Sequence, residues 1–326
     1  DKAELKKQLL SAVAKTMEYL QSIGVDLETI RKQHDVFLRI KLKDDAVEAI
    51  LTTEQTKKDF LQKAAWVERN HKAYLPDPSD SETGERVYLI LKIAKQIRSL
   101  SGDVDVSDVM ARVEQLLDES VAGFKIAEPE GGWKQYDLSQ IDFDELHKRF
   151  EKGRKRMLLE QLKQSVETKI AELIRVNYSR IDFAEKYNEM LKEYIDPQTN
   201  LDEIFEKLKQ FSQSLIEEEK RYLREGLDNE EQLAVFDILT RPNLALTKDE
   251  VGEVKLIARD LLQTLQQEKM VLDWKKKQQA RASIKNTIAK MLDQLPRVFT
   301  KELYQEKCDL VYKYVYNLTQ ATPHYA

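Results

Sequence analysis

The stretch TKDEVGEVKLIARDLLQTL, residues 247–265, carries the pattern that decides the fold class. Its first four residues, Thr247 to Glu250, form a capping box, in which a threonine and a glutamate side chain satisfy free backbone N–H groups at a helix start. Apolar side chains then recur with the period of one helix face, at Val251, Val254, Ala258, Leu261 and Leu265, and Leu272 further on continues this stripe. The stretch is therefore predicted to be a long amphipathic helix.

The same helical pattern extends outward over most of the chain. Further helices are predicted near 2–21, 26–33, 36–50, 54–74, 87–100, 107–120, 142–151, 155–176, 183–194, 201–224, 230–239, 277–294 and 300–318. Nine glycines and seven prolines in 326 residues make up about 5% of the chain, where roughly 12% is usual. With few turn formers and no strand pair or internal repeat, the sequence predicts an all-α, multi-helix fold without a sheet.

Composition excludes several classes of protein. The net charge of −5 gives no global argument for a nucleic-acid-binding protein. The single Cys308 excludes an intramolecular disulfide framework and a multi-cysteine zinc site, and it fits a reducing compartment. No apolar run approaches the roughly 18 residues of a membrane span, and no signal peptide opens the sequence. These features predict a soluble, cytoplasmic protein with no membrane partner.

Motifs for catalysis are missing from the sequence. No glycine is followed by lysine, so the phosphate-binding loop of nucleotide hydrolases is absent. The four histidines are far apart, and Cys308 has no histidine near it in sequence, so a buried structural thiol is the favoured interpretation. The triplet Glu253-Val254-Lys255 matches the end of a nuclease signature, but chance explains it in a chain this rich in Glu and Lys. We therefore predict no catalytic, cofactor-binding or metal-binding residue.

Two basic clusters stand out against the acidic background. The first has six basic residues against Glu151, namely Lys148, Arg149, Lys152, Arg154, Lys155 and Arg156. The second has six basic residues against Asp273, namely Lys269, Lys275, Lys276, Lys277, Arg281 and Lys285. Each cluster is a candidate surface for a DNA backbone or a protein partner. The alternative for each is an ordinary solvated helix face whose lysine stems cover apolar surface.

Two aromatic features also allow two interpretations. Trp274 lies beside the second basic cluster, where it could stack on a base, but it also extends an apolar helix stripe and could simply pack inside the protein. Tyr304, Tyr312, Tyr314 and Tyr316 crowd the final predicted helix. That helix is apolar enough to be buried in its own domain or presented to a partner.

Several blocks together resemble a known family. The run EKMVLDWKKKQQAR from Glu268 to Arg281 and the run LYQEKC from Leu303 to Cys308 are similar to the C-terminal region of the restriction, or motor, subunit of type I restriction–modification enzymes. The acidic stretch from Glu217 that leads into LAVFDILT (233–240) is similar to the same region. Further blocks of the resemblance are LPDP (75–78), VSDVM (106–110) and IDF (141–143) with Arg149-Phe150.

The resemblance implies that this chain is the helical C-terminal fragment of a longer subunit, as its start at Asp1 also suggests. In that family a nuclease domain and two RecA-like motor domains come first, so ATP and Mg would be bound there and no cofactor is expected here. Residues 1–176 would follow the motor domains, and residues 177–326 would form the C-terminal assembly domain. Judged by glycine and proline content alone, the long loop expected at 122–137 is the stronger candidate for the domain boundary.

The implied function is non-catalytic. The chain would couple an ATP-dependent DNA translocase and endonuclease to the methyltransferase core of modification and specificity subunits, in a prokaryotic cytoplasm. Its expected partners are that core, the motor domains of its own chain and double-stranded DNA. The two basic clusters, with Trp274, are the expected contact residues. The alternative is a stand-alone helical scaffold with no role on DNA.

Overall fold

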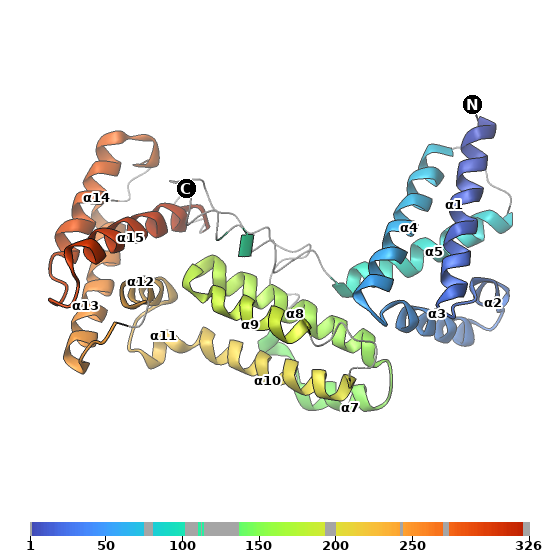
Figure 1. Ribbon diagram of the computed structural model, residues 1–326, viewed down its shortest axis with the longest axis horizontal. Helices are drawn as coiled ribbons and strands as arrows, with labels where there is room; N and C mark the ends of the chain where they lie inside the picture. The colour runs from blue at the N-terminus through green and yellow to red at the C-terminus, as the bar shows by residue number, and fades with distance from the viewer. Residues whose placement is uncertain are drawn as a thin grey trace. The chain divides into compact units, whose positions relative to one another are not determined.

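The computed structural model describes residues 2–74, 81–101, 110–111, 113, 137–192, 200–241, 244–269 and 274–321. Throughout these residues the secondary structure is helical, without a strand (Figure 1). The all-α prediction is therefore confirmed. The predicted loop at 122–137 and the predicted helix at 107–120 lie almost wholly outside the described residues.

Long helices alternate with short 3-10 or π turns, labelled η, along the described part of the chain. The elements are α1 (Lys2–Ser22), α2 (Leu27–Lys32), α3 (Val36–Ile50), α4 (Glu54–Tyr74), α5 (Ser81–Ser101), η2 (Leu138–Gln140), α7 (Phe143–Glu151), α8 (Lys155–Val176), η3 (Tyr178–Arg180), α9 (Ile181–Lys192), α10 (Leu201–Glu219), α11 (Arg221–Arg224), α12 (Glu230–Thr240), α13 (Lys248–Thr264), η5 (Leu265–Lys269), η6 (Trp274–Lys276), α14 (Gln278–Leu292) and α15 (Lys301–Ala321).

The chain divides into two compact units whose segments alternate along the sequence. Unit 1 comprises residues 1–103, 140–166 and 189–210, and unit 2 comprises residues 104–139, 167–188 and 211–326. The functional boundary expected at residue 176 coincides with the end of α8, at Val176. Whether it separates two functional parts stays a prediction.

Unit 1 is built around α1, α4 and α5. Helices α1 and α4 pack along each other, and α5 packs on α4 (Figure 1). Their shared core includes Leu9, Phe60, Val67, Ile90 and Ile93. Asp26 and Asp35 cap α2 and α3, as their carboxylates accept hydrogen bonds from the first backbone N–H groups of each helix. These two capped helices lie against α5.

Unit 2 is centred on α12. Every residue from Gln232 to Leu239 is buried there, as expected of a helix that is apolar all round. Helices α13 and α15 pack on it, and α14 packs on α15 (Figure 1). The capping box at Thr247 and Glu250 is confirmed, with both reciprocal hydrogen bonds formed.

The single helix predicted over 201–224 is wrong, because α10 ends at Glu219 and a separate short helix follows. The cause lies at the Glu218 carbonyl, which a continuing helix would offer to the N–H of Tyr222. That carbonyl instead accepts a hydrogen bond from Nη2 of the buried Arg180 at 3.1 Å. Lys220 N–H turns to the Glu217 carbonyl at 3.2 Å, and the helix breaks there.

Candidate interaction surfaces

The first basic cluster divides into an exposed half and a paired half. Lys148 and Arg149 are exposed on the last turn of α7, and Lys152 is exposed at its C-cap. Cations in this position interact favourably with the carbonyl end of the helix. These three residues remain available to a partner.

The other half of that cluster holds unit 1 together. Arg154 pairs with Asp45 (Nη1–Oδ1 2.5 Å), and Lys155 pairs with Asp202 (Nζ–Oδ1 2.6 Å). The backbone N–H of Arg156 donates to Glu48 at 3.1 Å. Arg154 takes a left-handed conformation with φ of 62°, which brings its guanidinium to α3. Because the charges of Arg154 and Lys155 are used within unit 1, they contribute little to a surface for phosphates. Arg156 is engaged through its backbone N–H, and its half-buried guanidinium is not part of these ion pairs.

Trp274 is buried, so it offers no open face to a nucleic-acid base. Only 3% of the residue is exposed, and its ring packs edge-on to Tyr316 with ring centroids 5.6 Å apart. Of the two interpretations of this residue, packing is the one that the structure shows. Trp274 is the first residue of η6, the turn between η5 and α14, and its side chain packs in the core of unit 2. It is therefore a support for its neighbours rather than a direct contact.

Beside Trp274 lies a basic surface along α14. Lys277, Arg281 and Lys285 are spaced four residues apart and so share one helix face, which we call the α14 stripe. No acidic residue occurs from Trp274 to Leu292, and none of the three pairs with a carboxylate in the described part of the chain. Lys277 and Lys285 are exposed, and Arg281 is half-buried. The α14 stripe is thus a local positive surface on an acidic protein.

Two further lysines belong to this region. Lys276 is exposed on η6, whereas Lys275 is half-buried over the rings of Tyr316 and Trp274, with its Nζ 4.8 and 5.9 Å from their centroids. Burial lowers the pKa of Lys275 to about 8, since desolvation penalises its charged form. The side chain of Lys269 and all of Asp273 lie outside the described residues.

The tyrosines of the final helix serve mainly the core of unit 2. Tyr312 and Tyr314 are buried together with Val311, Val315 and Leu318. Lys285 lies over the ring of Tyr312, with its Nζ 4.5 Å from the centroid. Of the two interpretations of α15, burial in its own domain is therefore the one observed. Helix α15 also packs against α14, and its Tyr312 lies under Lys285 of the α14 stripe.

The described residues offer no candidate metal centre and no exposed thiol. No cluster of three His, Cys, Asp or Glu side chains there could hold a metal ion. Cys308 is buried, and burial raises the pKa of its thiol, which disfavours the reactive thiolate. No described helix is long and apolar enough to cross a membrane.

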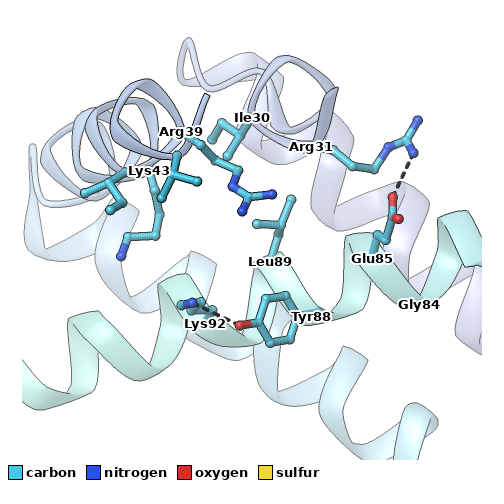
Figure 2. A pocket seen from close by; sticks show the side chains of 11 residues that line it. Ile30, Arg31, Arg39, Lys43, Gly84, Glu85, Tyr88, Leu89 and Lys92 are labelled. Atoms are coloured by element: carbon cyan, nitrogen blue, oxygen red, sulfur yellow. Dashed lines mark hydrogen bonds and ion pairs between the residues drawn. The ribbon is translucent and has the colours of Figure 1, made fainter. Parts of the chain in front are cut away.

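A pocket of about 560 Å³ in unit 1 was not predicted from the sequence. It is lined by residues of α2, α3 and α5, among them the cationic side chains of Arg39, Lys43 and Lys92 and the ring of Tyr88 (Figure 2). A signal for it was present in the sequence. The stretch VFLRIKL, residues 36–42, is more apolar than one buried helix face requires, so some of its large side chains had to remain exposed.

Comparison with known proteins gives one match. The family model "Type I restriction enzyme HindI endonuclease subunit-like, C-terminal" matches residues 1–321. The chain belongs to this family. The resemblance read from the blocks between Leu75 and Cys308 is therefore confirmed, and in the residues that the structure describes this HindI endonuclease subunit-like C-terminal region consists of helices joined by short turns. No curated protein and no solved structure matches the chain.

Proposed function

We propose that this region is a non-catalytic assembly module, which couples the ATP-driven DNA translocase of a type I restriction endonuclease subunit to the methyltransferase core. ATP and Mg would be bound by other domains of that subunit. Family membership supports a place within such an enzyme complex. The coupling role and the contacts below are our inference.

The observation that carries a DNA contact is the α14 stripe. From Lys277 to Lys285 the stripe runs eight residues, or about 12 Å along the helix axis. Over that distance one DNA strand presents about three to four phosphates. Side chains that pair with no carboxylate in the described residues can neutralise these phosphates and release counterions. The stripe therefore suits a backbone contact that does not depend on base sequence.

The test compares DNA binding by the complete chain and by two triple variants. In the first, Lys277, Arg281 and Lys285 are all changed to Gln. In the matched control, Lys6, Lys7 and Lys58, three exposed lysines of unit 1, are changed to Gln, so that the net charge is the same. Binding to a 30-base-pair duplex is measured by fluorescence anisotropy between 50 and 200 mM salt.

We expect the α14 variant to bind at least about tenfold more weakly at 50 mM salt and to lose up to three units of the slope of log K against log salt. The control should keep the slope. Equal binding by all three proteins, or binding that does not depend on salt, would favour the alternative of a helical scaffold with no role on DNA.

Docking on the methyltransferase core is tested separately. The complete chain is titrated onto a reconstituted core of modification and specificity subunits, first without DNA and then with a 30-base-pair duplex, by sedimentation velocity. A complex supports the coupling role. Absence of a complex both with and without DNA would limit this region to a structural extension of the translocase.

A further inference from the structure

We propose that the pocket between α3 and α5 is a docking site for an acidic amphipathic helix of a protein partner. This site lies within unit 1 and does not depend on the α14 stripe, which belongs to unit 2. The two sites can therefore fail or succeed independently.

The apolar part of the site comes from the first turns of α3. Of the residues that line the pocket, Val36 is 56% exposed and Ile40 is 49% exposed. Phe37, the next residue after Val36, is 85% exposed but is not itself part of the lining. Val36 and Ile40 lie four residues apart on the pocket side, facing Leu89 and Tyr88 of α5. Contiguous exposed apolar side chains of this size mark an interaction site more often than a free surface.

The polar part of the site is positively charged. Arg39 projects between the helices toward Leu89, and Lys43 and Lys92 also line the pocket (Figure 2). Arg31 and Glu85 balance each other at one end, with Nη1 and Oε2 3.0 Å apart. Arg39 pairs with no carboxylate among the described residues, and Lys43 reaches only Asp44, at 4.0 Å.

The hydrogen bond between Lys92 and Tyr88 in this pocket leaves the lysine charged. Nζ of Lys92 donates to the hydroxyl of Tyr88 at 2.9 Å, which orients the ammonium group without neutralising it. The pocket thus combines apolar walls with three cations, of which only Lys43 has an acidic partner in the described part of unit 1, Asp44 at the long distance of 4.0 Å. A ligand complementary to both features carries large apolar side chains and carboxylates.

A helix suits this geometry best. A third helix laid between α3 and α5 would present apolar residues at i, i+3 or i+4 and i+7 to the walls, with Asp or Glu beside them facing the cations. Phosphates of DNA would meet the cations but leave Phe37, Val36 and Ile40 uncovered. A second copy of the chain is a poor occupant. Its described acidic amphipathic helix, α10, already buries Ile204, Phe205, Leu208 and Leu215.

The experiment selects ligands directly. A phage-displayed library of 16-residue helical peptides is selected on the complete chain and depleted on the variant Ile40→Glu. Enriched peptides are synthesised with a fluorescent label, and their Kd is measured by anisotropy. Three proteins are compared with wild type, namely Ile40→Glu, the double variant Arg39→Glu/Lys43→Glu, and the control Leu256→Glu, which alters an exposed leucine of α13 in unit 2. Circular dichroism confirms equal helicity.

We expect enriched peptides with the apolar spacing above and with flanking acids. Their Kd should rise at least about tenfold with Ile40→Glu and with the double variant, and stay unchanged with Leu256→Glu. Changing the peptide acids to Lys should restore binding to the double variant, because the charges are exchanged.

Three results would overturn the proposal. The first is that no peptide is enriched over the Ile40→Glu depletion. The second is that peptides bind the double variant as tightly as wild type. The third is that the pocket serves another ligand, shown either by Ile40-dependent self-association in sedimentation or by Ile40-dependent binding of a 20-base-pair duplex. Failure of DNA binding at the α14 stripe would leave this proposal unaffected.

Discussion

Glu160, in α8, is the clearest single-residue determinant of stability in unit 1. Its carboxylate is buried and accepts hydrogen bonds from Lys57, from Ser101 at 2.9 Å and from Lys163 at 3.2 Å. Burial by itself would raise the pKa of Glu160. The two ammonium groups and the hydrogen bonds from Lys57 and Ser101 outweigh it and hold this pKa at about 2.

Changing Glu160 to Gln should lower the free energy of unfolding by about 3 kcal/mol at pH 7, because the buried Lys163 and the half-buried Lys57 lose their buried counter-charge and keep only the more exposed Glu54. The carboxylate has a lower pKa in the folded state than its ordinary 4.5, so its stabilisation is complete above that value. As the pH falls from 4.5 toward 2, the difference between wild type and variant should shrink. Urea unfolding of both proteins at pH 7 and pH 3 measures this difference in stability.

The matched control for that measurement is Glu68→Gln. Glu68 also pairs with a lysine, Lys72, at 2.7 Å, but that lysine is exposed. An exposed pair contributes about 0.5 kcal/mol or less. An equal loss in the two variants would show that burial does not strengthen the Glu160 network.

Trp274 determines the stability of the turn that precedes the α14 stripe. Replacing this ring by Ala leaves a cavity beside Tyr316, and we expect the free energy of unfolding to fall by about 3 kcal/mol or more. Lys277→Ala is the control, since its exposed side chain makes no capping hydrogen bond, and it should change stability by less than about 0.5 kcal/mol. A small effect of Trp274→Ala in urea unfolding would contradict the burial of this ring.

At the scale of elements, the start of α13 allows a test of how much a capping box stabilises a helix. Thr247 accepts the N–H of Glu250 at 3.3 Å, and Glu250 accepts the N–H of Thr247 at 2.7 Å. Thr247→Ala removes the first hydrogen bond and should cost about 1 kcal/mol. Thr247→Ser restores a hydroxyl and should recover most of that loss. Urea unfolding of both variants measures these changes in stability. Equal stability of the Ala and Ser variants would show that the capping hydroxyl does not stabilise the protein.

Helices were predictable from the sequence because their signals are local. The capping box at Thr247 and the apolar period that follows it contain all the information that α13 requires. The break between α10 and α11 was not predictable in this way. It depends on the side chain of Arg180, which comes from 38 residues earlier and takes a carbonyl from the helix. Only the tertiary fold brings the two groups together.

The candidate surfaces likewise divide into features that the local sequence predicts and features that depend on the tertiary fold. Charge density in the sequence singled out residues 274–285, because the lack of acids from 274 onward is a property of the sequence itself, and their role as a contact surface stays a prediction. It could not separate Lys148 from Lys155, because the partner of Lys155 is Asp202, which lies 47 residues away. The pocket between α3 and α5 was missed for a related reason. Its walls come from α2 and α3 and from α5, which the chain brings together only in the folded unit.

At the scale of the whole molecule, the two units are interleaved along the sequence. Residues of α8 and of α10 are divided between unit 1 and unit 2. Unit 1 therefore needs residues 189–210 to be complete. Phe205 of α10 is fully buried and stacks on Phe150 of α7, with ring centroids 4.2 Å apart. A cut at residue 176 would remove Phe205 from unit 1 while leaving Phe150.

This interleaving predicts that residues 1–176 do not form a complete folding unit. In a chain ending at 176, loss of Phe205 and of the Lys155–Asp202 pair should expose Phe150 and destabilise α7 by about 2 kcal/mol or more, which corresponds to roughly thirtyfold faster amide exchange. A chain ending at 219 keeps all of α10 and should protect residues 143–151 as the complete chain does. Hydrogen–deuterium exchange of peptides covering α7 in the three chains measures this. Equal protection in the chain ending at 176 would show that the expected boundary at residue 176 is a folding boundary after all, and that deletions there could replace point variants in tests of docking.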